Sequence, residues 1–476
     1  MTVLAIDQGT SGTKAIVVDP NDGVVGLAEV PVHPRYLNGG AVEQDPDKLL
    51  ESVVAAGRSA VEQAARPIDA VSLANQGETV LAWDPDTGRP LTPAIVWQDR
   101  RAEAVCQELQ DYRDMVAART GLVLDPYFSA PKMAWLRRNM ETDGVVTTSD
   151  TWLLHQLTGE FVTDATTASR SMVVELGDTD WSRELLALFA LDGERLPRIV
   201  GNDEIVGTTG AFGGDVPVGG IVVDQQAALL AEACLDPGMA KCTFGTGAFL
   251  LANTGPTAVR SSSGLTSSVA WRIAGQDTFC VDGQVYTAAS AVRWLTDLGI
   301  IDGPADMDAI AAPDNNGVLC VPALAGLAAP WWKSQATASI SGMTLSTGRG
   351  HIVLAVLQGI AAQIAELVAA INTDTTTPLT TLRADGGLTQ SKVLMQACAD
   401  ILQVPVEVYP SAHATALGAA ALAQLSLRPQ QPVRGLVTGW HPVATYEPSW
   451  SPARAAEFQG QWRELASGTY LAQENS

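Results

Sequence analysis

Two glycine-threonine turns, far apart in the chain, carry the residue types that build phosphate-binding loops. The first is DQGTSGT at 7–13 and the second is FGTG at 244–247. Glycine leaves no Cβ between the backbone and an anion, so several N–H groups can converge on one phosphate. One such turn is common in ordinary hairpins, but a third glycine turn at 386–387, between a predicted strand and a predicted helix, strengthens the pattern. The three turns predict a nucleotide site.

A carboxylate accompanies each of the first two turns. Asp7 lies within the first turn, and Asp224 follows the apolar strand 221–223, about 20 residues before the second turn. Taken singly, an aspartate at a strand end is more often a helix cap or a surface ion-pair partner. Asp224, however, lies between an apolar strand and an apolar helix, from which it can face a cleft and accept a proton from a hydroxyl. The arrangement suits a metal-bound nucleoside triphosphate with a base opposite.

Aromatic and polar residues predict the second half of that site. Trp97, Tyr127 and Phe249 are each more often core residues when taken alone. Trp97, however, adjoins the polar run 98–101, and Tyr127 follows a loop-like Asp-Pro pair. A polar cluster that includes Gln76, Gly77 and Glu78 also ends a predicted strand, where open α/β sheets present ligand contacts. Aromatic walls with polar floors are typical of polyol sites.

The length of 476 residues predicts two domains with an interdomain cleft. A glycine-rich stretch at 213–220 places the boundary near 230, giving domains 1–230 and 231–476. Strands and helices alternate in both halves, and the hairpin around 239–251 resembles the one that opens the chain. We therefore expect a duplicated α/β architecture.

The bulk composition excludes several classes of partner. With 52 acidic and 29 basic residues the formal net charge is -23, which disfavours nucleic acid and an anionic membrane. No apolar run is expected to approach the ~20 residues that span a bilayer. Six scattered cysteines without a CxxC pair, and a chain that begins directly with a strand, predict reduced thiols in a cytoplasmic protein. The five histidines lack metal-ligand spacing.

Several of these segments together resemble the FGGY carbohydrate kinases and, within them, the glycerol kinases. The likeness runs from DQGTSGTKAIVVD at 7–19 to HATALGAAALA at 413–423. YFSAPKMAWLRRN at 127–139 and ASISGMTLSTGRGHIVLAVLQ at 338–358 are similar to the two family signatures. The resemblance implies an actin-like, ribonuclease-H-like α/β fold of two domains, with MgATP and substrate meeting in the cleft. It is also compatible with a homodimer.

The resemblance further implies a role for each matching residue. Asp224 would be the general base, and Asp7 and Asp224 would hold Mg²⁺, Asp7 through water. ATP would be bound by Thr10, Ser11, Lys14, Thr246, Gly247, Ala289, Ala329, Gly387 and Ser391. The acceptor would be bound by Gln76, Gly77, Glu78, Trp97, Tyr127, Asp224, Gln225 and Phe249.

One departure from the pattern concerns the acceptor. Glycerol kinases carry an arginine directly before the substrate glutamate, whereas this chain has Gly77 before Glu78. The expected activity is ATP-dependent phosphorylation of a terminal hydroxyl of a small polyol or sugar, and the space at Gly77 favours an acceptor of four or five carbons. An authentic glycerol kinase that tolerates Gly77 is one alternative. A non-metabolic actin-like ATPase, which would have no use for the residues around Glu78, is another.

Overall fold

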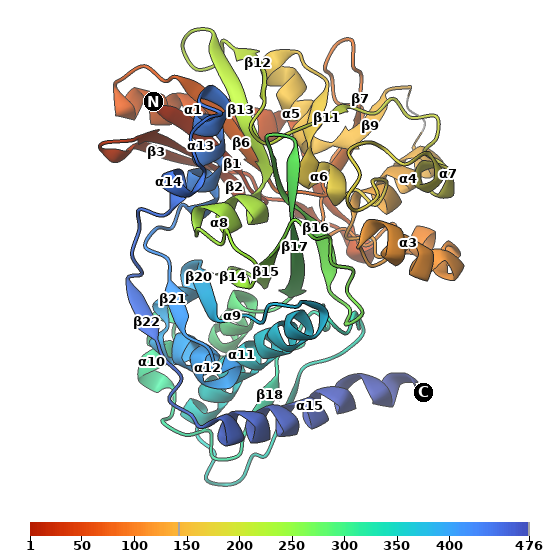
Figure 1. Ribbon diagram of the computed structural model, residues 1–476. Helices are drawn as coiled ribbons and strands as arrows, with labels where there is room; N and C mark the ends of the chain where they lie inside the picture. The colour runs from red at the N-terminus through yellow and green to blue at the C-terminus, as the bar shows by residue number, and fades with distance from the viewer. Residues whose placement is uncertain (141–142, 475–476) are drawn as a thin grey trace.

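The computed structural model describes residues 1–140 and 143–474. It contains two α/β domains, one above the other in Figure 1. The strands of the first half are β1 (Val3–Gln8), β2 (Gly12–Asp19), β3 (Gly23–Pro31), β4 (Arg35–Tyr36), β5 (Val42–Gln44), β6 (Ala70–Asn75), β7 (Val80–Trp83), β8 (Ala94–Ile95), β9 (Val145–Thr148), β10 (Val162–Asp164), β11 (Arg198–Val200), β12 (Ile205–Thr209) and β13 (Val216–Val223). Its helices are α1 (Pro46–Ala64), α2 (Glu103–Glu108), α3 (Arg113–Thr120), α4 (Ser129–Asn139), α5 (Ser149–Thr158), α6 (Ala165–Ser169), α7 (Arg183–Leu188) and α8 (Asp224–Ala231).

The second half is built in the same style. Its strands are β14 (Met239–Phe244), β15 (Ala248–Gly255), β16 (Thr266–Ile273), β17 (Gln276–Val285), β18 (Leu319–Val321), β19 (Ser339–Ser341), β20 (Thr381–Asp385), β21 (Val406–Val408) and β22 (Ala444–Tyr446). Its helices are α9 (Ala289–Asp297), α10 (Met307–Ile310), α11 (Arg349–Asp374), α12 (Lys392–Leu402), α13 (Ala414–Leu427), α14 (Arg434–Val437) and α15 (Pro452–Glu474).

The central sheets of the two domains repeat one strand order. The first sheet runs β12-β13-β6-β1-β2-β3. The second, written in the same direction, runs β22-β21-β20-β14-β15-β17-β16, with β16 as an additional strand at its edge. The hairpin β1–β2 is antiparallel and β1 is parallel to β6; likewise β14–β15 is antiparallel and β14 is parallel to β20. The expected duplication is therefore confirmed, and it puts the two glycine turns at equivalent hairpins.

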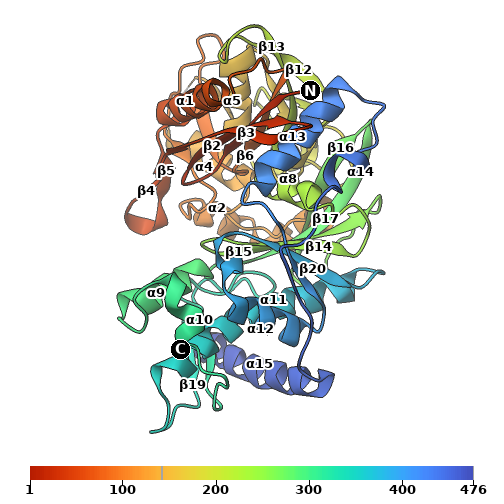
Figure 2. The ribbon, with the colours of Figure 1, turned by 90° about the vertical axis from the view of Figure 1, so that its left-hand side faces the viewer.

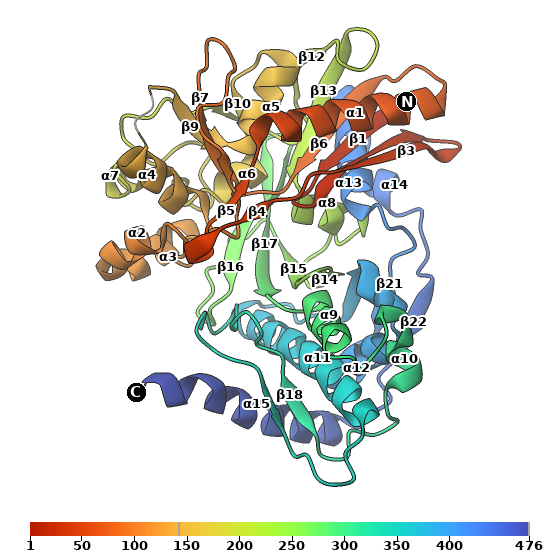
Figure 3. The same cartoon turned by 180° about the vertical axis from the view of Figure 1, so that it is seen from behind.

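Both faces of the first sheet are covered by helices because the side chains of a strand alternate between faces. In β1, Leu4 shares a buried cluster with Val53 of α1, whereas Ala5 shares one with Ala420 of α13. Figure 3 shows α1 lying across this sheet, seen from behind. The sequence predicts the start of α1 correctly: Asp45 is its N-cap and accepts from the Asp47 amide.

Helix α13 belongs to the second half of the sequence but packs on the first domain (Figure 2). It approaches α8 closely, because a Cβ at Gly418 would lie 1.9 Å from the Ala227 carbonyl oxygen. A domain boundary at 230/231 separates the two repeats, but it assigns α13 to the second domain although this helix packs on the first.

Helix α11 forms the centre of the second domain. Its apolar stretch is long enough to cross a membrane by length and composition, so the expectation that no such run exists was wrong. However, 83% of that stretch is buried inside the protein, which identifies α11 as a core helix. All six cysteines are free and buried.

A smaller sheet, β4-β5-β8-β7-β9, is inserted between β3 and β13 of the first domain. Figure 2 shows the β4–β5 hairpin extending from the body of this domain toward the second one. The segments around this sheet supply several of the side chains that line a cleft between the domains, among them Gln76, Glu78 and Trp97.

Candidate active site

The first glycine turn joins β1 to β2 and is fixed by its own backbone. The Gly9 amide donates to the Gly12 carbonyl at 3.0 Å, and the Val32 amide donates to the Ser11 carbonyl at 3.0 Å. Asp7 and Lys14 are cross-strand partners in this hairpin. Their pairing places one carboxylate and one ammonium beside the turn, as a bound metal-phosphate group requires.

The second turn, between β14 and β15, is held by the start of α9. The amides of Ala289 and Ser290 donate to the carbonyls of Gly245 and Thr246, at 3.1 and 3.2 Å. Gly247 has no room for a side chain, because a Cβ there would lie 2.4 Å from the Val285 carbonyl oxygen. Ala289 therefore supports this turn through its backbone.

Three aromatic rings meet between the two turns, as the sequence predicts. The Trp97 ring makes edge contacts with Tyr127 at a centroid distance of 5.6 Å and with Phe249 at 5.9 Å. The Trp97 indole also donates to Thr10 Oγ1 at 2.8 Å. The cluster of three rings is thus attached to the first glycine turn.

Asp224 is the first residue of α8 and lies half-buried in the cleft. Removal from bulk water, followed by the charges of Asp7 and Glu78, raises its pKa to about 7. Burial likewise raises the pKa of Asp7 to about 6. A carboxylate with a pKa near neutrality is well matched to general base catalysis.

Neighbouring side chains orient the polar floor. Gln76 donates to Gln44 Oε1 at 2.9 Å, which leaves Gln76 Oε1 buried and without a partner among the described residues. Lys241 donates to Gln225 Oε1 at 2.5 Å and to Thr243 at 2.7 Å. Glu78 has a φ of +45°, a conformation that non-glycine residues adopt at a cost and that often marks functional sites.

A cleft of about 590 Å³ collects most of the predicted site. It is lined by these predicted residues: Thr10, Ser11, Gln76, Glu78, Trp97, Tyr127, Asp224, Gln225, Thr246, Gly247 and Phe249. Gly77 adjoins it, with a φ of +61° and the Val223 side chain 3.4 Å from where a Cβ would lie.

Two of the predicted nucleotide residues have other contacts. Ala329 lies in the core of the second domain, 1% exposed. Ser391 is the N-cap of α12, and its hydroxyl accepts from the Leu394 amide and donates to Asp308. Gly387 is exposed and begins the 3₁₀ turn 387–390, which lies between β20 and α12, so the glycine turn lies between a strand and a helix as the sequence predicts.

Two charged residues in the cleft were missed by the sequence reasoning. Arg170, directly after α6, donates from Nε to Glu78 and from Nη1 to Asp282 Oδ1. Both partners are buried, and Asp282 comes from β17 of the other domain. The sequence signal is weak: Asp282 lies in a strand that carries several other polar residues, and Arg170 lies within a run of threonines and serines.

The residues present fit a Mg²⁺ ion. Asp7 lies close enough to Asp224 for its charge to raise the pKa of Asp224, and a divalent cation would relieve that repulsion. Within 1–140 and 143–474, no group of three or more His, Cys, Asp or Glu side chains is arranged to hold a metal. Mg²⁺ typically needs only one or two carboxylates when phosphates and water complete its shell.

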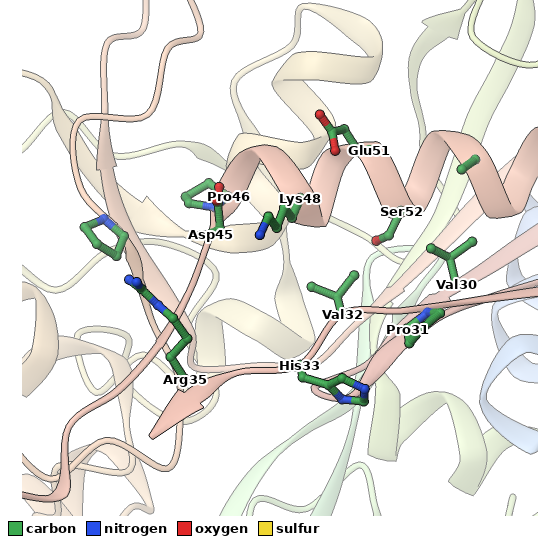
Figure 4. A pocket seen from close by; sticks show the side chains of 12 residues that line it. Val30, Pro31, Val32, His33, Arg35, Asp45, Pro46, Lys48, Glu51 and Ser52 are labelled. Carbon is green, nitrogen blue, oxygen red and sulfur yellow. The ribbon is translucent and has the colours of Figure 1, made fainter. Parts of the chain in front are cut away.

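A second hollow, of about 810 Å³, lies apart from the cleft near the start of α1 (Figure 4). Lys48 and Glu51 of α1 and His33 from the segment after β3 are among its lining residues. These three side chains are exposed and of mixed charge, and no predicted site residue lines this hollow.

Comparison with known proteins agrees with this geometry. Residues 2–231 match the N-terminal domain of the FGGY family of carbohydrate kinases, and residues 240–427 match its C-terminal domain. The chain belongs to the FGGY family of carbohydrate kinases. A glycerol kinase of Aromatoleum aromaticum is 41% identical over 97% of both chains, and glycerol kinase 2 of Thermotoga maritima is 40% identical over 98% of both.

A solved structure supports the same assignment for the fold. Plasmodium falciparum glycerol kinase, crystallised with ADP, superimposes with a TM-score of 0.92 and 32% identity over 98% of both chains. This FGGY kinase thus has the two-domain, actin-like fold predicted from its sequence. Its activity is the ATP-dependent transfer of a phosphate to an alcohol group of a small polyol or sugar.

Proposed function

We propose that this kinase binds MgATP between the two glycine turns and transfers the γ-phosphate to a terminal hydroxyl of a small polyol, with Asp224 as general base. The observation that carries the proposal is the position of Asp224. It lies in one cleft with the Trp97 wall on the acceptor side and with Thr10 and Thr246 of the two turns on the phosphate side.

The chain's residues then have distinct tasks in the transfer. The acceptor hydroxyl would lie within hydrogen-bond reach of Asp224, which orients its oxygen in line with the γ-phosphate and takes its proton as the bond to phosphorus forms. Lys14 and the turn amides would hold the phosphate oxygens while the bond to ADP breaks. A Mg²⁺ held by Asp7 and Asp224 would supply neutralisation of the charge on the β- and γ-phosphates.

Closing the cleft would also serve the reaction. Water competes with the polyol as an acceptor of the phosphate. If the two domains close when the polyol binds, water is kept away from the γ-phosphate during the transfer. The aromatic wall, attached to the first turn through Trp97 and Thr10, couples the acceptor side to the phosphate side.

Replacing Asp224 with asparagine tests the proposal. We expect Asp224→Asn to lower kcat by about 10²- to 10⁴-fold, because the amide cannot take the proton, while the Kd for ATP and acceptor changes little. Asp47→Asn, at an exposed carboxylate in α1, is the matched control and should keep full activity. Undiminished turnover of Asp224→Asn would overthrow the assignment.

For the acceptor we propose a polyol or sugar of four or five carbons, because Gly77 leaves space beside Glu78. The second candidate is glycerol, which is supported by 40% identity to glycerol kinases over nearly the whole chain. Measuring kcat/KM for three- to six-carbon polyols and ketoses distinguishes the two. A maximum at glycerol would show that the argument from Gly77 is wrong.

The alternative of an actin-like ATPase without a metabolic acceptor is set aside by the match of residues 2–231 and 240–427 to the FGGY kinase domains, and ADP release should therefore depend on a polyol or sugar. We expect release to rise when a mixed polyol pool is added. A cytoplasmic location and a homodimer also stay predictions, which cell fractionation and analytical ultracentrifugation would test.

A further inference from the structure

The cleft contains one buried guanidinium whose role the reaction scheme above leaves open. Arg170 is 5% exposed, lines the cleft, and lies between two carboxylates. Its Nε donates to Glu78 Oε1, and its Nη1 donates to Asp282 Oδ1 at 3.1 Å. A buried ion pair costs desolvation energy and is seldom a net source of stability, which invites a functional explanation.

The surroundings hold this guanidinium in one place. Asp282 is fixed in turn by Thr266, whose hydroxyl donates to Asp282 Oδ2 at 2.8 Å. The guanidinium carbon also lies 5.8 Å from the centre of the Tyr127 ring and 5.7 Å from that of Phe128. Arg170 is therefore oriented before any ligand binds, and it borders the ring that we assign to the acceptor wall.

The donor inventory leaves capacity for a ligand. A guanidinium has five N–H donors, and the described residues of the chain provide acceptors for two of those on Arg170. Glu78 accepts at one oxygen from Arg170, which leaves its second oxygen for another donor. Adjacent donors and acceptors of this kind match two neighbouring hydroxyls, each of which both donates and accepts.

We infer that Arg170, held in place by Asp282, acts with Glu78 to bind a vicinal diol of the acceptor, and that Arg170 is a specificity-determining residue of this kinase. The inference rests on the kinase function proposed above. Gly77 has no side chain that could take this role, so Arg170 supplies the guanidinium from another element. The acceptors are then polyols and sugars with two adjacent hydroxyls, at least one of them distal to the oxygen that is phosphorylated.

The same contacts link acceptor recognition to both domains. Glu78 and Arg170 belong to the first domain, whereas Asp282 lies on β17 of the second. A diol bound to Arg170 therefore interacts with a group that is anchored across the cleft. Acceptor binding and the relative position of the domains are coupled through this one side chain.

The test pairs variants of the enzyme with variants of the acceptor. Erythritol and threitol are compared with 1,4-butanediol, and glycerol with 1,3-propanediol; the second compound of each pair keeps the terminal hydroxyls but has no vicinal diol. Wild-type protein, Arg170→Lys and Asp282→Asn are assayed for kcat/KM with each acceptor, and the KM for ATP and the Tm are recorded. Arg272→Lys is the control, a buried arginine that pairs with Asp277 outside the cleft.

We expect Arg170→Lys to lower kcat/KM for the best full polyol by about 10- to 100-fold, the value of a hydrogen bond to a charged group. The loss should be much smaller for the counterpart without a vicinal diol, because that contact is already absent. Asp282→Asn should show the same dependence on the acceptor, and Arg272→Lys should show none.

Equal losses on both members of each acceptor pair, or no loss at all, would overturn the inference. A purely structural role of Arg170 gives equal losses together with a lower Tm. Failure of the underlying function looks different: the wild-type enzyme would then phosphorylate no acceptor of the panel.

Discussion

The two sides of the cleft are built in different ways. The side that we assign to the phosphates consists of two glycine turns, each within a single hairpin and held by backbone hydrogen bonds such as Gly9 to Gly12. The side that we assign to the acceptor consists of side chains from separate elements, among them Glu78 before β7, Arg170 after α6 and Phe249 in β15. A phosphate can be gripped by amides that any sequence carries, whereas a polyol must be recognised by particular side chains.

The difference teaches how each side tolerates change. On the phosphate side the contacts come from backbone amides, so the critical residues are glycines such as Gly247, where a side chain would displace the turn. On the acceptor side the chemistry of the side chain matters, and its support comes from distant parts of the chain. Mutations that act on only one of these properties can separate the two sides.

Among the changes that separate the two sides, the largest effect is expected from a side chain placed in the second turn. In Gly247→Val, a Cβ would lie 2.4 Å from the Val285 carbonyl oxygen, so the turn must move. We expect kcat/KM for ATP to fall by about 100-fold, because displacing reacting groups by an ångström costs that much. Gly193→Ala, where no atom lies within 4 Å, is the control in the same steady-state assay. A Gly247→Val enzyme with normal ATP kinetics would refute the backbone-grip interpretation.

A smaller loss is expected at the aromatic wall. The Trp97 ring, which Tyr127 and Phe249 hold in place, is proposed to pack against the acceptor. Trp97→Ala removes about 2 kcal/mol of this apolar contact with the acceptor, so kcat/KM for the acceptor should fall by about 30-fold. Trp97→Phe keeps a ring but loses the hydrogen bond to Thr10. If the wall is attached to the phosphate turn, Trp97→Phe should change the KM for ATP more than the KM for the acceptor. The reverse order would show that the two sides act independently.

The smallest change is expected in the pH dependence. The pKa of Asp224 is raised to about 7, and only its ionised form can take a proton. Activity is therefore present above pH 7 and is lost as the pH falls, so kcat/KM for the acceptor at pH 6 should be about tenfold below its plateau. The residual activity of Asp224→Asn should lack this limb. A flat wild-type profile from pH 5.5 to 8 would contradict the role of Asp224.

The sequence predicts the phosphate side better than the acceptor side. Turns such as 244–247 are contiguous, and the glycine that permits the turn is itself the signal. Trp97 could be selected because it adjoins a polar run, and Tyr127 because it follows an Asp-Pro pair. Phe249 lies in an apolar stretch, and its assignment rests on the family resemblance. Arg170 and Asp282 could not be selected, because their significance lies in their contact across 112 positions of the chain.

For two residues predicted to bind the nucleotide, the family pattern did not reveal the contacts that they make in the fold. Ser391 matches the family pattern, but in the fold its hydroxyl serves α12 and Asp308, and Ala329 packs in the core. A motif fixes which residue stands at a position, whereas its contacts depend on neighbours that the motif does not contain.

By itself, the sequence determined the two repeats, their glycine turns and the carboxylates that follow the strands, because these features follow from local backbone preference and strand alternation. The tertiary structure alone decided that α13 returns to the first domain and that Arg170 joins Glu78 to Asp282. These contacts depend on packing between elements that are distant in sequence. Helix α13 can approach α8 because Gly418 has no side chain, and Arg170 pairs with Glu78 and Asp282 because buried charges require partners.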